Sequence, residues 1–124
     1  MSARILVVED QEDNRTILRD LLTSVGFVVL EATTGEEGVR MAEEHEPDLI
    51  LMDIQLPLLD GYEATRRIKA RAELRAIPIL AVTSYALSGD DEKAQAAGCD
   101  GYVTKPFDPW ELLATVRSHL HAGG

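Results

Sequence analysis

The sequence predicts an α/β fold with one five-stranded parallel sheet and helices on both of its faces. The first observation is a set of five short apolar runs bounded by polar or turn residues, which is typical of buried parallel strands. The second is that stretches with apolar residues at helical spacing separate these runs. Five successive strand–helix units favour a sheet covered on both faces, and right-handed crossovers leave few strand orders. We predict the order 2-1-3-4-5.

Each expected element has a local signal in the sequence. The predicted strands are residues 5–8, 27–32, 49–53, 79–83 and 101–104. The predicted helices cover about residues 13–25, the stretch from Thr34 to just before Pro47, about residues 62–70, residues 90–97, and the stretch from Asp108 to about Leu120.

The first helix is predicted from one apolar stripe and a glycine stop. The stripe consists of Ile17, Leu18, Leu21, Leu22 and Val25, and Gly26 is the expected C-cap. The second helix is expected to begin at Thr34, because Glu37 stands three residues later as its capping-box partner. It is expected to end before Pro47, because the residue preceding a proline avoids the α region.

The later helices carry comparable signals. Pro57 and the pair Asp60-Gly61 mark the loop that leads into the third helix. Acidic residues open the fourth helix at the positive end of its dipole, and Gly98 is its expected cap. The last helix opens with Asp108 as N-cap and Pro109 in its first turn. Its predicted buried stripe is Trp110, Leu113, Val116 and Leu120, with Leu112 alongside.

Length and composition suit one compact domain. The 124 residues are 45% hydrophobic, and we expect a single domain, with a core over about residues 4–120 and no output domain. Twelve basic against 22 acidic residues give a formal charge of -10, which argues against direct nucleic-acid binding. No apolar stretch approaches the ~20 residues of a membrane span. Cys99 is the only cysteine, so an intracellular, cytoplasmic setting is expected, with Cys99 as a packing residue.

Polar residues stand where the expected strands end. Glu9 and Asp10 follow the first strand, Asp53 ends the third, Thr83 ends the fourth, and Lys105-Pro106 follows the fifth. In open parallel sheets, ligands bind outside the carboxyl ends of the strands. Three carboxylates without a cation would repel one another and raise their pKa values. Hard oxygen ligands suit Mg²⁺, and a nearby lysine can reach a phosphoryl oxygen.

Each of these signals alone has an ordinary structural explanation, such as a solvated turn, a helix cap or a β-branched strand residue. Their occurrence together, each at the end of its own strand, is what indicates a phosphoryl site that uses Mg²⁺. The flavodoxin-like strand order places a crevice between the first and third strands, and Asp10 and Asp53 leave the sheet there.

The chain resembles the response-regulator receiver domains, the CheY-like family, from Ile5 to about Leu120. The matching motifs are Val8-Glu9-Asp10, Leu51-Met52-Asp53, Leu56-Pro57-Leu58-Leu59-Asp60-Gly61, Ala81-Val82-Thr83 and Gly101-Tyr102-Val103-Thr104-Lys105-Pro106. CheY is itself a standard example of the strand order 2-1-3-4-5, so that order is matched to the family and is no independent prediction. The chain is similar to stand-alone receivers of the DivK type and to receivers within hybrid kinases.

The resemblance implies a role for each residue of these motifs. Asp53 is the phosphoacceptor, and Mg²⁺ is held by Asp10, Asp53 and the Gln55 backbone carbonyl, with Glu9 acting through water. Thr83 and Lys105 contact phosphoryl oxygens, and Tyr102 is the switch aromatic. The Lys105-Pro106 bond is expected to be cis, with Pro106 directing the lysine. The family often has two aspartates where this chain has Glu9 and Asp10, and a glutamate there is a common form.

The resemblance also implies partners. The donor would be a sensor histidine kinase or a histidine phosphotransfer protein, and the signal would leave through contact with a downstream protein. The chain is expected to promote its own phosphorylation and dephosphorylation without being an enzyme on a separate substrate. The initiating methionine favours a complete stand-alone protein over an excised receiver.

Two residues flank the expected site and are candidates for tuning the phosphate lifetime. Gln55 and Tyr85 stand two positions beyond Asp53 and Thr83 respectively. We hypothesise that Tyr85 screens the path by which water reaches the acyl phosphate; the alternative is that it only packs on the surface.

Three rival functions make different demands on these motifs. A phosphatase of the aspartyl-phosphate class should carry an acid/base Asp two residues after its nucleophile, where this chain has Gln55. A flavin-binding module needs a phosphate loop after the first strand, where the acidic Gln11-Glu12-Asp13 would repel phosphate. The remaining alternative is a non-phosphorylated pseudo-receiver that only binds partners. A pseudo-receiver typically lacks one of Asp53, Thr83 or Lys105, and all three are present.

Overall fold

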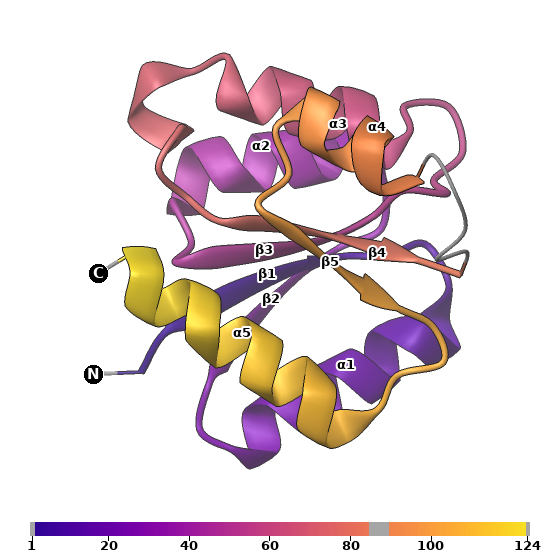
Figure 1. Cartoon of the computed structure of the whole chain (residues 1–124), viewed down its shortest axis with the longest axis vertical. Helices are drawn as coiled ribbons and strands as arrows, with labels where there is room; N and C mark the ends of the chain where they lie inside the picture. Colours follow the sequence, from indigo (N-terminus) through magenta and orange to yellow (C-terminus); the bar gives the residue numbers. More distant parts are fainter. Residues whose placement is uncertain (1, 85–89, 124) are drawn as a thin grey trace.

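Five parallel strands form one sheet, as the sequence predicts. The computed structural model describes residues 2–84 and 90–123 (Figure 1). The strands are β1 (Arg4–Val8), β2 (Val28–Ala32), β3 (Leu49–Asp53), β4 (Ile79–Thr83) and β5 (Gly101–Thr104). Their order in the sheet is β2-β1-β3-β4-β5, which confirms the predicted order. The first strand begins one residue earlier than predicted because Arg4 pairs with Val28 of β2.

Helices cover both faces of the sheet (Figure 1). They are α1 (Glu12–Ser24), α2 (Gly35–His45), α3 (Gly61–Lys69), α4 (Asp90–Ala97) and α5 (Pro109–Gly123), and a short 3₁₀ helix, η1 (Ala72–Leu74), precedes β4. Helices α1 and α5 lie on one face, and α2, α3 and α4 lie on the other. No helix in the described part of the chain is both long and apolar enough to cross a membrane.

The buried strands explain why the apolar runs of the sequence are continuous. In β3, Ile50 and Met52 pack under the face with α2, α3 and α4, whereas Leu49 and Leu51 pack under the face with α1 and α5. Every residue of β3 is buried, because helices cover both of its sides. The last residue of this buried strand, Asp53, therefore lies where the apolar core ends.

The start of α2 follows the predicted signal with one difference. The Thr34 hydroxyl accepts a hydrogen bond from the Glu37 backbone N–H at 3.0 Å. The Glu37 carboxylate accepts from the backbone N–H of Thr33, and not from that of Thr34 as a standard capping box would require. The helix ends before Pro47, where Glu46 has a φ of 44°.

Three residues assigned to buried stripes are exposed, so those assignments were wrong. Ile17 and Trp110 each lie roughly 100° around their helices from the centre of the buried side, at 100° per residue, and they are 51% and 84% exposed. Val25 points in the right direction but follows Ser24, the last residue of α1, and is also exposed. The buried residues of α1 are Leu18 and Leu22.

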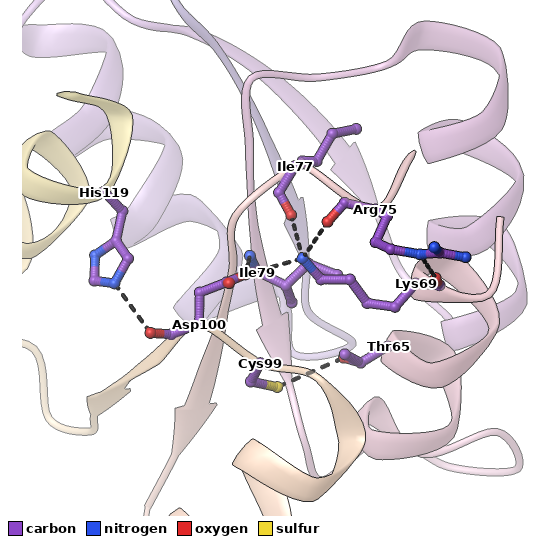
Figure 2. A network of polar contacts seen from close by, with 8 residues as sticks. All are labelled: Thr65, Lys69, Arg75, Ile77, Ile79, Cys99, Asp100 and His119. Atoms are coloured by element: carbon purple, nitrogen blue, oxygen red, sulfur yellow. Dashed lines mark hydrogen bonds and ion pairs between the residues drawn. The ribbon is translucent and has the colours of Figure 1, made fainter. Parts of the chain in front are cut away.

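A polar network joins the elements at the edge of the sheet where β4 begins (Figure 2). The Lys69 ammonium at the end of α3 donates to the carbonyl oxygens of Arg75 (3.0 Å) and Ile77 (2.7 Å), and to the Asp100 carboxylate (3.0 Å). The same carboxylate oxygen accepts from the backbone N–H of Ile79 at 2.8 Å. Lys69 therefore ties α3 and the connection after it to the starts of β4 and β5.

Replacing Lys69 with methionine is expected to lower the free energy of unfolding by about 2 kcal/mol, because hydrogen bonds to charged groups contribute about 1.5–3 kcal/mol. Phosphoryl acceptance should be unaffected, since this network lies at the opposite edge of the sheet from Asp53. Urea denaturation followed by far-UV circular dichroism checks the first expectation. Arg67→Met is a suitable control, because Arg67 lies on the same helix and its guanidinium forms an exposed ion pair with Glu63 at 3.7 Å, which contributes little stability. Equal losses in the two variants would contradict a role for the ammonium.

Cys99 lies beside this network and is a packing residue in the structure. It is buried, its thiol contacts the Thr65 hydroxyl at 3.8 Å, and burial raises the pKa of the thiol (Figure 2). This placement agrees with the packing role expected from the sequence.

Candidate functional site

Four strand ends bring polar side chains to the carboxyl edge of the sheet. Glu9 directly follows β1, Asp53 ends β3, Thr83 ends β4, and Lys105 directly follows β5. Since β1 and β3 are neighbours that pair in register, Glu9 and Asp53 emerge side by side. The connections after these two strands lead to α1 and α3, on opposite faces of the sheet (Figure 1). In open parallel sheets this is the arrangement that places a ligand site between two strands.

Asp53 is held by hydrogen bonds to both of its carboxylate oxygens. Its Oδ1 accepts from the backbone N–H of Gln55 at 2.9 Å, and its Oδ2 accepts from the Lys105 ammonium at 3.2 Å. The whole residue is only 2% exposed. The carboxylate therefore has a fixed orientation and is almost completely covered by the protein.

The Glu9 carboxylate contacts the same lysine ammonium as Asp53 does. The Lys105 Nζ lies 2.8 Å from Glu9 Oε1, and Glu9 is 1% exposed. The other oxygen of Glu9 accepts from the backbone N–H of Gln11 at 3.3 Å. One ammonium group thus serves two buried carboxylates.

The electrostatics of this cluster are unbalanced. Burial raises the pKa of Glu9 to about 7, and the neighbouring Asp53 carboxylate adds to the effect, whereas Lys105 opposes it. Burial disfavours the charge of Lys105, but the contacts with Glu9 and Asp53 outweigh it and raise the pKa of the lysine. Negative charge therefore exceeds what the single cation offsets.

The carboxylates fit a divalent cation. Glu9, Asp10 and Asp53 each offer an oxygen, and these three oxygens lie within 4.8 Å of one another. Three carboxylates and one ammonium sum to -2, which a divalent cation would neutralise. Oxygen donors of this kind, with room for water on the exposed side of Asp10, suit Mg²⁺. Gln55 contributes its backbone N–H to Asp53, and its carbonyl belongs to the same turn.

The other predicted site residues are placed as follows. Thr83 is buried at the end of β4, and the Lys105 backbone N–H donates to its carbonyl at 2.8 Å. The Lys105–Pro106 peptide bond is cis, as the resemblance implied. Tyr102 lies on β5 with its side chain exposed. Tyr85 lies outside the described residues.

Two residues that support the site were not predicted from the sequence. Arg15, on the first turns of α1, donates to the Glu9 carbonyl at 3.0 Å and pairs with Glu31 at 3.2 Å. Gly61 opens α3 against the end of β3: a Cβ atom added there would lie 2.2 Å from the Asp53 carbonyl oxygen. The Asp60-Gly61 pair signals a turn in the sequence, but this close approach depends on how the helix packs.

Comparisons with known proteins agree with this geometry. The family model described as the response regulator receiver domain matches residues 5–117. The polar-differentiation response regulator DivK of Brucella ovis is 42% identical over 120 residues, which cover 97% of this chain and 98% of DivK.

Solved structures show the same architecture. The receiver domain of sensor histidine kinase PA1611 from Pseudomonas aeruginosa PAO1 has a TM-score of 0.91 and 41% identity, covering 98% of this chain and 99% of that one. That structure has a magnesium ion coordinated in its active-site cleft. The chemotaxis protein CheY4 of Vibrio cholerae has a TM-score of 0.91 and 27% identity, covering 95% of this chain and 98% of its own.

Proposed function

Because the chain belongs to the response regulator receiver domain family, we propose that Asp53 accepts a phosphoryl group from a phosphohistidine, with Mg²⁺ as the cofactor. One observation carries the proposal: the buried Asp53 carboxylate lies within a cluster of three carboxylate oxygens and contacts the Lys105 ammonium at 3.2 Å. This arrangement supplies a fixed oxygen nucleophile, a cation site and an ammonium group that can donate hydrogen bonds to phosphoryl oxygens.

In the transfer, an Asp53 carboxylate oxygen forms a bond to phosphorus while the bond from phosphorus to the donor's imidazole nitrogen breaks. The imidazole leaves with its electron pair and takes up a proton. The hydrogen bond from the Gln55 N–H holds the carboxylate in position, since phosphoryl transfer depends mainly on in-line geometry and charge neutralisation. Mg²⁺, held by Asp10, Asp53 and the Gln55 carbonyl with Glu9 acting through water, would supply charge neutralisation at the reacting oxygens.

The remaining site residues are assigned to the conformational change that follows phosphorylation of Asp53. Lys105 is freed from Asp53 Oδ2 to contact a phosphoryl oxygen, and the Thr83 hydroxyl contacts another. Movement of Thr83 allows the exposed Tyr102 to turn inward. The phosphoryl group thereby biases a two-state equilibrium, and the altered surface is read by a downstream protein.

The proposed partners follow from the same chemistry. A sensor histidine kinase or a histidine phosphotransfer protein in the cytoplasm would donate the phosphoryl group, and no reaction on a separate substrate is involved. The relatives include both a response regulator and a receiver from a sensor kinase, and either context is compatible with this role.

The test is the intact mass of the protein after incubation with acetyl phosphate and Mg²⁺. We expect one phosphoryl adduct in the wild type, and none in Asp53→Asn or when Mg²⁺ is chelated. Asp60→Asn is the matched control, because Asp60 is an exposed helix cap and this variant should still be phosphorylated. A folded wild-type protein that gains no adduct and does not respond to beryllofluoride would instead favour a non-phosphorylated pseudo-receiver.

Gln55 and Tyr85 are proposed to set the phosphate lifetime. Replacing Tyr85 with asparagine should shorten the lifetime several-fold, because a small amide would no longer screen water from the acyl phosphate and could orient it. The decay of radiolabelled phosphoprotein after removal of the donor measures this effect. An unchanged half-life in Tyr85→Asn would assign Tyr85 a packing role only.

A further inference from the structure

Leu58 combines two properties that seldom occur together in a leucine. The residue is 102% exposed, the largest value among the exposed large hydrophobic residues of the described part of the chain. Its φ is 66°, in the left-handed region that non-glycine residues rarely adopt. Neither solvation nor backbone conformation favours a leucine at this position, so the choice of this residue type points to a functional role.

The conformation of Leu58 is imposed by its neighbours. Leu56 is buried, and Leu59 packs against the core from the other side. The Leu59 carbonyl oxygen lies so close to Gly35 that a Cβ atom added there would be 2.4 Å from it. The next residue, Asp60, caps α3 by accepting from Glu63 N–H at 2.9 Å. With these anchors fixed, the backbone holds Leu58 at one position as an exposed apolar projection.

This projection stands at the rim of the proposed phosphorylation site. Gly61 contacts the Asp53 backbone directly, and Leu58 precedes it by three residues, so its Cα lies at most about 11 Å from that of Gly61. Asp53 is recessed, and a phosphohistidine can reach it only if the protein that carries it comes into contact with the rim. Leu58 is the fully exposed apolar residue on the β3–α3 side of that rim.

We propose that Leu58 is a docking residue for the phosphohistidine-bearing protein and inserts into an apolar depression beside its phosphohistidine. This inference rests on the proposed function of Asp53. Because the backbone at Leu58 is already held in place, binding has only the Leu58 side chain to order. Leu58 is not among the residues assigned to the phosphoryl group or to the cation site, so its contribution is expected with protein donors only.

The test compares two donors across three variants. Leu58→Asn removes the apolar side chain and suits a positive φ, Leu58→Met retains an apolar side chain, and Val28→Thr alters an exposed residue at the opposite edge of the sheet. The donors are acetyl phosphate and a radiolabelled histidine phosphotransfer protein that phosphorylates the wild-type chain. We expect Leu58→Asn to lose roughly 10- to 100-fold in transfer from the protein, the effect of unburying one leucine, with normal labelling by acetyl phosphate. Leu58→Met and Val28→Thr should stay within a few-fold of the wild type with both donors.

The outcomes separate the inference from the proposed function. If acetyl phosphate does not label the wild type, the function assigned to Asp53 fails. If acetyl phosphate labels every variant and the protein donor labels Leu58→Asn at the wild-type rate, only the docking role is overturned. Equal losses with both donors would mean that Leu58 acts on the site itself. A loss of self-association without a loss of transfer would identify the occupant as a second copy of the chain, which also overturns the proposal.

Discussion

Replacing Gly61 with alanine is expected to remove about 3 kcal/mol or more of the free energy of unfolding, at the upper end of the cost of overpacking a core. The added Cβ atom would lie 2.2 Å from the Asp53 carbonyl oxygen and 2.6 Å from the Ile54 Cα. Both are backbone atoms, so no side-chain rotation can relieve the overlap. The start of α3 would have to move away from the end of β3, and the Asp53 carboxylate would move with it.

Two measurements check this expectation. Urea denaturation followed by circular dichroism should show the loss of stability, and acetyl phosphate should label Gly61→Ala more slowly than the wild type. Gly26→Ala is the control: its φ of 95° is unfavourable for alanine, but no atom lies within 4 Å of the added Cβ. It should cost only about 1–2 kcal/mol of backbone strain and leave phosphorylation unchanged. If the two variants lose equal stability and both are labelled normally, the contact at Gly61 is not what positions Asp53.

Replacing Lys105 with methionine is expected to destabilise the metal-free protein by about 3 kcal/mol at neutral pH, the cost of leaving buried carboxylates without their cation. Glu9 has a pKa of about 7 even with the lysine present, and the lysine lowers it. Its loss should therefore raise the pKa further. Phosphorylation should also be impaired, because Lys105 is the proposed contact for a phosphoryl oxygen.

The pH dependence identifies the charge as the cause. A carboxyl group whose pKa is higher in the folded protein binds more protons there than in the unfolded chain, so stability falls as pH rises from the unfolded pKa through the folded one. The deficit of Lys105→Met should thus be small near pH 5 and largest at about pH 8. Lys105→Arg keeps a cation at this position, so its free energy of unfolding should fall by less than that of Lys105→Met. A deficit that is the same at both pH values would assign the effect to packing of the lysine's methylene groups.

The fold was largely predictable because its signals are local and continuous. The apolar strands, the Thr34 and Asp108 caps and the stop before Pro47 each depend on neighbouring residues only. Helix faces were less predictable at their flanks: Ile17 stands beside the buried stripe of α1, and only the packed structure shows which side of it the core covers. The short helix η1 carried no signal, since three residues complete barely one turn.

The site was predictable as a set of residues and less so as a geometry. Glu9, Asp53, Thr83 and Lys105 stand at strand ends, and parallel strands end at a common edge. The support from Arg15 and the close approach of Gly61 depend on how α1 packs beside β1 and how α3 packs against the end of β3. The left-handed backbone at Leu58 likewise follows from the anchors on either side of it and has no signature in the residue type.

The exposure of Trp110 has a consequence for how this protein can be observed. It is the only tryptophan of the chain, and it is 84% exposed in the first turn of α5. Its indole is hydrated in the folded protein much as it would be in the unfolded chain, so intrinsic fluorescence will report unfolding poorly. A partner that covers α5 would shift the same emission to shorter wavelength. The protein therefore carries a built-in optical probe for docking at α5 that is nearly silent on folding.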